Sequence, residues 1–199
     1  MKHFLALMPC LLLASCGFNS AVVSLDYQPH LGQNIPGPRV VSIGRFSDMR
    51  TQDDFKLGTV RSPIGTPLET LKTRVPMAAV ARNAFAHGLK ARGMLAAEPE
   101  GAYVLTGEVY ELECYQMLYP VATAKIRVNI MRRGSGEITY SRVYQARRSG
   151  ETYAPGSGSP VQTLTDIASR TLQQVVDQAL DDRELRKRLR TPRASDTPR

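Results

Sequence analysis

The segment from Val121 to Met131 has the strictest periodicity in the chain. Apolar and polar residues alternate along it: Ala122, Ala124, Ile126, Val128 and Ile130 fall on one side, and Thr123, Lys125, Arg127, Asn129 and Met131 on the other. A period of two residues is that of a β-strand with one buried face. Because such a strand needs both neighbours and a covering layer, the chain must build a sheet that is packed on one side.

The segments on either side supply the neighbouring strands. Tyr103 to Cys114 is rich in β-forming residues, with Gly107 as a candidate bulge. Ile138 to Arg147 follows a Gly134-Ser135-Gly136 segment, which can provide the positive φ angles of a tight turn. The sequence therefore predicts a three-stranded antiparallel meander.

Two amphipathic helices flank this meander. The first begins near Val75-Pro76 and ends at Gly93, and the second begins at Ser159 and extends as far as Leu189. Ser159-Pro160-Val161-Gln162 fits a capping box. The apolar stripes are Met77, Val80, Ala81, Ala84, Phe85, Gly88 and Leu89 in the first helix, and Val161, Leu164, Ala168, Leu172, Val175 and Ala179 in the second.

The part of the chain before the first helix has weaker signals. Alternation predicts a short strand within Val22 to Tyr27 and a second strand from Arg39 to Phe46, whereas residues 47–74 read as a long irregular loop or a loose hairpin. The predicted fold class is α+β: an antiparallel or mixed sheet of about four to five strands, packed on one side by two helices. We expect one such domain over residues 39–190.

Residues 1–15 have the layout of a secretory signal. Lys2 precedes an apolar run from Phe4 to Leu13, and small residues stand just before Cys16. A membrane-spanning helix needs roughly 20 apolar residues, and Pro9 interrupts a run of half that length. We therefore expect a cleaved signal rather than a membrane span.

Leu13-Ala14-Ser15-Cys16 resembles the lipobox of bacterial lipoproteins. The resemblance implies cleavage between Ser15 and Cys16, diacylation of the Cys16 thiol with chains such as palmitate, and acylation of the new amino terminus. One acyl chain binds a membrane only marginally, but two or three hold a protein there. Residues 16–38 are then the lipidated cysteine, a tether and the first short strand, and Gly17 after the cysteine implies sorting to the outer membrane. The alternative is an ordinary signal peptide with an incidental cysteine.

The cysteine count excludes an internal disulfide. Cys10 leaves with the signal and Cys16 is used for lipid, so Cys114 has no partner. The stability of the domain must therefore come from a hydrophobic core, which a chain of this length can build.

No catalytic constellation is visible in the sequence. His30 and His87 lie apart and have no metal-ligand spacing with the cysteines, and Glu111 and Glu113 share a strand face without an acid–base partner. The glycine- and serine-rich stretch 149–160 lacks the Gly-Lys-Ser/Thr end of a phosphate-binding loop. We expect no enzymatic activity, no metal and no cofactor.

A basic run near the end of the sequence is its most suggestive surface feature. It comprises Arg186, Lys187, Arg188, Arg190 and Arg193. Clustered cations attract anionic lipid headgroups, lipopolysaccharide or another acidic envelope polymer, while the alternative is a solubilising helix end that complements the helix dipole. Residues 191–199 are expected to be a disordered basic tail. Despite the formal net charge of +8, the export signal argues against nucleic acid as a partner.

Three motifs together resemble the YajG-like family of bacterial outer-membrane lipoproteins. They are VSLDYQP at 23–29, SIGRFSDMR at 42–50 with its Phe-x-Asp-x-Arg pattern, and VARNAFAHGLKARGM at 80–94, which leads to YVLTGEVYELEC at 103–114. The match runs from Val22 to Leu189. The resemblance implies a compact α+β domain on the outer membrane with no established enzymatic activity.

These observations predict an outer-membrane-anchored lipoprotein that faces the periplasm and acts as a non-catalytic binding or envelope-assembly component. Its partners would be the membrane, through the lipid anchor, and an envelope protein or acidic polymer. The alternative is an auxiliary lipoprotein of an envelope lipid transporter or of a secretion channel. The outer face of the meander is polar, so we expect contacts through edge strands and a monomeric domain.

Overall fold

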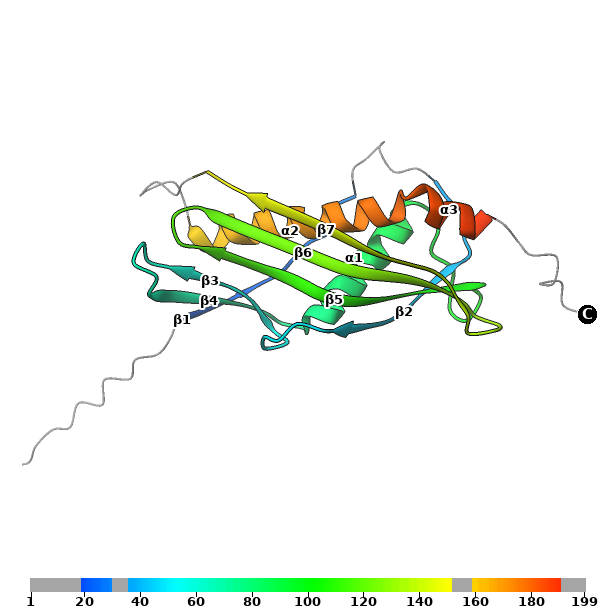
Figure 1. The fold of residues 1–199 in the computed structure, drawn as a ribbon, viewed down its shortest axis with the longest axis horizontal. Helices are drawn as coiled ribbons and strands as arrows, with labels where there is room; N and C mark the ends of the chain where they lie inside the picture. Colours follow the sequence, from blue (N-terminus) through cyan, green and yellow to red (C-terminus); the bar gives the residue numbers. More distant parts are fainter. Residues whose placement is uncertain (1–18, 30–35, 152–158, 191–199) are drawn as a thin grey trace, which may run out of the picture.

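The computed structural model describes residues 19–29, 36–151 and 159–190, which form one mixed β-sheet with helices on one face (Figure 1). The strands are β1 (Asn19–Val23), β2 (Val41–Asp48), β3 (Lys56–Arg61), β4 (Pro67–Thr73), β5 (Tyr103–Gln116), β6 (Pro120–Arg132) and β7 (Ile138–Ser149), and the helices are α1 (Met77–Ala91), α2 (Pro160–Leu180) and α3 (Arg183–Arg190). The α+β class is confirmed. The prediction of four to five strands and two helices was too low, since the described residues form seven strands and three helices.

The meander is confirmed and forms the centre of the sheet. β5 pairs with β6 and β6 with β7, both antiparallel. The predicted apolar side of β6 is buried, with Ile126, Val128 and Ile130 fully inaccessible. Helix α2 packs against β5, β6 and β7, and α1 packs against β2 and β5, so one face of the sheet carries the core.

Gly107 is not a bulge. It pairs in register with Val128 on one side and Phe46 on the other, and the irregularity of β5 lies between Val109 and Glu111 instead. A Cβ atom on Gly107 would lie 2.3 Å from Cε1 of Phe46. The glycine therefore makes room for the Phe46 ring.

Residues 47–74 contain a hairpin, as one of the two predicted alternatives proposed. β3 and β4 pair antiparallel around a turn at residues 62–66. The order across the sheet is β1-β4-β3-β5-β6-β7, and β2 also pairs with β5. β2 runs parallel to β5 along Tyr103 to Val109 and β3 along Cys114 to Gln116, so these two strands occupy the same edge of β5 one after the other.

The two early strands are shifted relative to their predicted positions. β1 covers Asn19–Val23, before most of the predicted Val22–Tyr27 segment, and pairs in parallel with β4. Residues 24–29 have no partner strand, and their alternation instead reflects burial of Tyr27, which is 8% exposed. β2 lies two residues later than the predicted strand at both ends.

Helix α1 matches its prediction closely. It begins after Pro76, its buried residues are the seven of the predicted stripe, and Gly93 follows it with a left-handed φ of 66°. Helix α2 differs at both ends. Ser159 makes no side-chain capping bond, so the predicted capping box is wrong, and α2 stops at Leu180 instead of extending to Leu189.

The break between α2 and α3 is caused by Asp182. Its Oδ1 accepts hydrogen bonds from the backbone N–H groups of Glu184 and Leu185, which starts a new helix in a different direction. Among the described helices, none combines the length and the apolar character needed to cross a bilayer.

Candidate functional site

A groove of about 1360 Å³ lies between residues 22–29 and helix α2. Its lining is mainly polar and contains five glutamines: Gln28, Gln162, Gln173, Gln174 and Gln178. Asp26, Asp166, Arg148 and Arg170 add charges of both signs. An amide side chain can donate and accept hydrogen bonds at once, so this lining suits a ligand that carries both kinds of group.

One wall of the groove is the last strand of the sheet. Within the described residues β1 pairs only with β4, and its Val22 and Val23 line the groove. A strand in this position leaves backbone N–H and C=O groups unpaired on its outer side. The predicted role of the Val22–Tyr27 segment as a contact edge thus coincides with a hollow of the surface.

A buried ion-pair network closes one end of this groove, where Asp177 belongs to both. Arg92 is 2% exposed and uses all five of its N–H donors. Its Nε and Nη2 donate to the two carboxylate oxygens of Asp181 at 2.9 and 2.6 Å, and Nη2 also donates to Asp177 at 3.0 Å. Nη1 donates to the Tyr27 hydroxyl at 3.0 Å and to the carbonyl of Gly88 at 3.2 Å.

Burial and hydrogen bonds in this network keep Tyr27 and Arg92 protonated at neutral pH. Burial raises the pKa of Tyr27 to about 12, and the Tyr27 hydroxyl donates to Asp177 at 2.7 Å. Burial alone lowers the pKa of Arg92, but the hydrogen bonds that Arg92 donates to Asp181, Tyr27 and Asp177 outweigh burial and leave that pKa raised. Because the Arg92 donors are all satisfied within the protein, the network positions α1, α2 and residues 24–29 rather than a ligand.

Arg186 belongs to the same network and is not a surface residue. It is 7% exposed; its guanidinium donates to the carbonyls of Leu180 and Pro36 at 2.8 and 3.1 Å and to Asp181 at 3.0 Å. The predicted anionic-surface contact of Arg186 was therefore wrong. Its side chain is held inside by Asp181, which neutralises it.

The other predicted basic contacts are dispersed. Lys187 and Arg188 line a second hollow of about 540 Å³ between α3 and the β6–β7 hairpin, together with Arg132, Glu137 and Glu184. Arg190 is exposed on α3, and Arg193 lies outside the described residues. Helix α3 lies at the opposite end of the molecule from the start of β1 (Figure 1). The predicted contact with an acidic surface stays a prediction, without Arg186.

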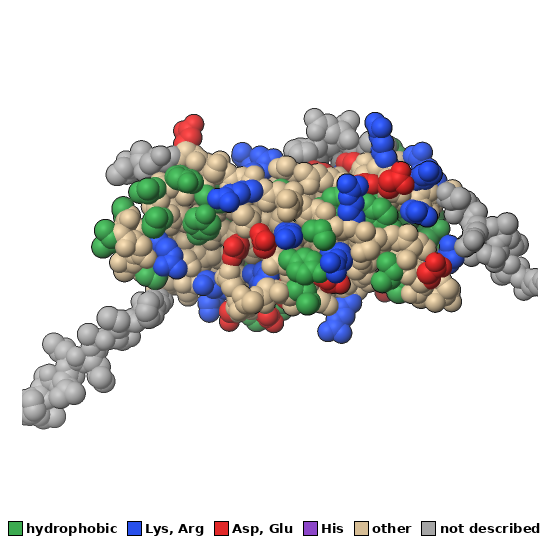
Figure 2. Space-filling model, viewed as in Figure 1, with side chains coloured by type: hydrophobic (Ala, Val, Ile, Leu, Met, Phe, Trp, Pro, Cys, Tyr) green, Lys and Arg blue, Asp and Glu red, His purple; other side chains and the backbone are tan. Residues whose placement is uncertain are grey.

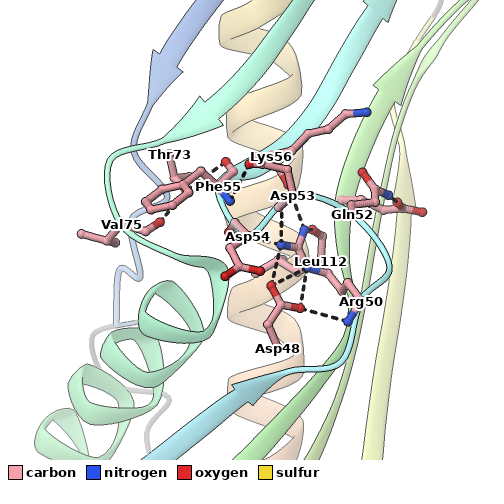
Figure 3. A network of polar contacts seen from close by, with 11 residues as sticks. Asp48, Arg50, Gln52, Asp53, Asp54, Phe55, Lys56, Thr73, Val75 and Leu112 are labelled. Carbon is pink, nitrogen blue, oxygen red and sulfur yellow. Dashed lines mark hydrogen bonds and ion pairs between the residues drawn. The ribbon is translucent and has the colours of Figure 1, made fainter.

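The Phe-x-Asp-x-Arg motif forms a second buried ion pair, shown in Figure 3. The Arg50 side chain is 3% exposed and makes a forked contact with Asp48, at 2.9 Å from Nε and 2.7 Å from Nη2. Nη1 donates to the carbonyls of Lys56 and Leu112 at 2.8 and 3.1 Å. Leu112 lies in the part of β5 that neither β2 nor β3 covers, so Arg50 takes the place of a strand there. We assign the motif a structural role.

The side chains that could take part in catalysis or metal binding lie apart from one another or are unreactive. His87 is exposed on α1, and His30 lies outside the described residues. Burial, followed by the charge of Glu113, raises the pKa of Cys114 to about 12, which keeps this thiol protonated at neutral pH. Within the described ranges, no group of three His, Cys, Asp or Glu side chains is placed to hold a metal ion. Ser15 and Cys16 lie outside those ranges, so cleavage and lipidation stay predictions.

Local sequence patterns did not predict that Arg92, Asp177 and Asp181 form a unit. The sequence does contain a signal: Asp177 lies in α2 and Asp181 follows its last residue, so the two aspartates are four residues apart and fall on one face of the helix next to the buried stripe. Their partner, however, lies 85 and 89 residues earlier. No local pattern joins residues at that separation.

Comparison with known proteins shows the fold alone. No protein-family model and no curated protein matches the sequence. Protein XCC0632 from Xanthomonas campestris, of the DUF330 family model, superposes with a TM-score of 0.58 at 15% identity, covering 81% of this chain and 95% of that one. An uncharacterised protein gives 0.52 at 10% identity, covering 80% and 94%.

Lipoprotein GNA1162 from Neisseria meningitidis gives a TM-score of 0.31 at 15% identity, covering 69% of this chain and 98% of that one. A TM-score of this size does not define a shared fold. The chain thus has the fold of XCC0632 and of the uncharacterised protein.

Proposed function

We propose that this protein is a non-catalytic lipoprotein, anchored in the outer membrane by lipid on Cys16, whose periplasmic domain binds an extended segment of another envelope protein. The groove between residues 22–29 and α2 is the observation that carries the proposal. The lipobox at Leu13 to Cys16 and the motifs that resemble YajG-like lipoproteins support the anchoring and the location.

The chemistry of the groove favours a polypeptide. An incoming strand can add to the outer side of β1 through main-chain hydrogen bonds, which is a common mode of peptide recognition. The glutamines on α2, such as Gln174 and Gln178, can pair with both N–H and C=O groups of such a segment. Affinity would be modest, because the groove offers few apolar anchors.

The anchor is tested by processing and fractionation. Cys16→Ala should block lipidation and leave uncleaved precursor, while the unaltered protein should be recovered with the outer membrane. A soluble Cys16→Ala product of mature length would contradict the lipobox. Recovery of the unaltered protein with the inner membrane would contradict its location.

The groove is tested by site-specific photocrosslinking in cells. A photoreactive amino acid replaces Gln178, which is exposed in the groove, or Asn83, which is exposed on α1 outside it. We expect a discrete crosslinked protein from position 178 only. Adding Ser169→Trp, which fills the groove, should abolish it. Equal products from both positions, or a product that persists with Ser169→Trp, would exclude the groove as the binding site.

Oligomeric state separates this proposal from the secretion-channel alternative. The chain from Gly17 onward should be monomeric by light scattering at micromolar concentration. A stable ring would instead favour a channel-associated lipoprotein.

A further inference from the structure

Exposed apolar side chains gather at one end of the sheet. In the β3–β4 turn and its flank, Ile64 is 90% and Leu68 56% exposed, and in the β5–β6 turn Leu118 is 55% and Tyr119 49% exposed. Figure 2 shows hydrophobic side chains clustered at this end, where the tips of β3 and β4 and the β5–β6 turn lie. Turns usually carry polar residues, so two adjacent apolar tips call for an explanation.

The strand register makes the two turns neighbours. β3 and β5 are parallel, with Val60 opposite Gln116, and each turn starts within two residues of this pair. Adjacent strands lie about 4.8 Å apart. The two tips therefore form one apolar edge, which we call the apolar end.

The described chain also begins at the apolar end. Asn19, the first residue of β1, pairs with Glu69 next to Leu68. Cys16 precedes Asn19 by three residues, a span of at most about 11 Å at 3.3–3.6 Å per residue. Lipid on Cys16 would thus hold the apolar end within about 11 Å of the bilayer.

We propose that the apolar end docks on the membrane, with Ile64, Leu118 and Tyr119 inserted at the level of the lipid headgroups. This inference rests on the proposed lipid anchor and adds a fixed orientation to it. Aromatic and aliphatic side chains favour that interface. Arg147 and Arg148, exposed at the same end of β7, can meet anionic headgroups, although Glu151 partly offsets them.

A bilayer explains this end better than a second copy of the chain does. The apolar residues occupy the tips of two turns that protrude at the end of the sheet (Figure 1). Stable protein interfaces bury at least about 1,200 Å² in all, which demands broader surfaces. With the apolar end on the membrane, α3 and its basic residues face away from it.

A tryptophan reporter tests the orientation, because the sequence contains no tryptophan. Leu118→Trp protein, purified with detergent from the membranes of the cells that produce it, is reconstituted in vesicles of phosphatidylethanolamine and phosphatidylglycerol, with or without brominated acyl chains. The matched control is Ile138→Trp, since Ile138 is 58% exposed at the other end of β7. We expect a blue-shifted emission for Leu118→Trp that brominated lipid quenches several-fold more than that of Ile138→Trp.

The outcomes separate the two proposals. Vesicle flotation reports the anchor: if the protein reconstituted in this way fails to float with the vesicles, the anchor and the docking are both wrong. If it floats but both reporters keep the emission of water-exposed tryptophan, the anchor holds and the docking is wrong. A concentration-dependent blue shift of the Leu118→Trp protein without vesicles would show that a second copy covers this end, and would also overturn the inference.

Discussion

Replacing Asp181 with asparagine should lower the free energy of unfolding strongly, although the two side chains have nearly the same shape. Its carboxylate lies between two buried guanidinium groups and accepts two hydrogen bonds from Arg92 and one from Arg186. Asp181→Asn keeps the shape of the side chain but removes its charge. It also turns an N–H group toward one of the arginine donors.

The expected cost follows from the burial of the arginines. Removing one partner of a buried ion pair costs about 3–5 kcal/mol, because it leaves an uncompensated charge. The Asp181 side chain is 29% exposed and Asp177 still pairs with Arg92, which places the loss near the lower limit, about 3 kcal/mol. That is a large part of a typical stability of about 5–15 kcal/mol.

Urea unfolding, followed by circular dichroism on the chain from Gly17 onward, measures this loss. With a slope of about 2 kcal/mol per molar urea, the midpoint should fall by about 1.5 M. Asp166→Asn is the matched control, because Asp166 is exposed on α2 and, among the described residues, its side chain accepts a hydrogen bond only from Gln162, at 2.8 Å. Its stability should change by less than about 0.5 kcal/mol.

Equal midpoints for Asp181→Asn and Asp166→Asn would refute this reasoning. They would mean that water reaches the guanidinium groups well enough to replace the carboxylate. The network would then not stabilise the junction of α1, α2 and α3.

Three further changes probe other parts of the fold. Gly107→Ala should cost about 2 kcal/mol in the same urea assay, because its Cβ would overlap the Phe46 ring; an unchanged midpoint would show that the ring can move aside. Asp182→Ala should cost about 1 kcal/mol at pH 7 through the lost cap of α3. Burial raises the pKa of Asp182, but hydrogen bonds, chiefly that of the Leu185 N–H, leave it lowered. This part of the stability is thus present above pH 4 and lost as the pH falls below it, so the variant should differ less from the unaltered protein at pH 3 than at pH 7. Finally, Cys114 should resist alkylation at pH 8 until urea unfolds the chain, because burial raises its pKa to about 12. The contribution of the protonated thiol to the free energy of unfolding is fully present below about pH 8.5, the pKa of an unfolded cysteine, and is lost as the pH rises toward 12. Rapid labelling of the folded protein would contradict its burial.

The central part of the fold was predictable because local periodicity there equals the burial pattern. The seven apolar residues of α1 and the five alternating apolar residues of β6, from Ala122 to Ile130, are buried as the sequence predicts. The side of the sheet formed by β1, β4 and β3 was not. Its strands are short, its β3–β4 register shifts twice, and its parallel pairs join distant segments.

The polar interior was less predictable because charge normally indicates exposure. Arg186 stands in a run of basic residues, a pattern that predicts an exposed side chain. In the structure it is buried, and its N–H groups donate to Asp181 and to two backbone carbonyls. Arg50 similarly completes the backbone pairing of β5. Both roles depend on carbonyl groups that no residue pattern specifies.

The chain enters the domain through β1, and a force that pulls on the preceding residues acts along the axis of this strand. β1 and β4 run in the same direction, from Asn19 opposite Glu69 to Val23 opposite Thr73. A pull on the residues before Asn19 therefore shears all of these hydrogen bonds together instead of unzipping them one by one. Beyond β1, the hydroxyl of Tyr27 and the carbonyl of Gln28 are bonded to Asp177 and Gln173 of α2. Tension applied from that side is thus shared between the sheet and a 21-residue helix before it reaches the core.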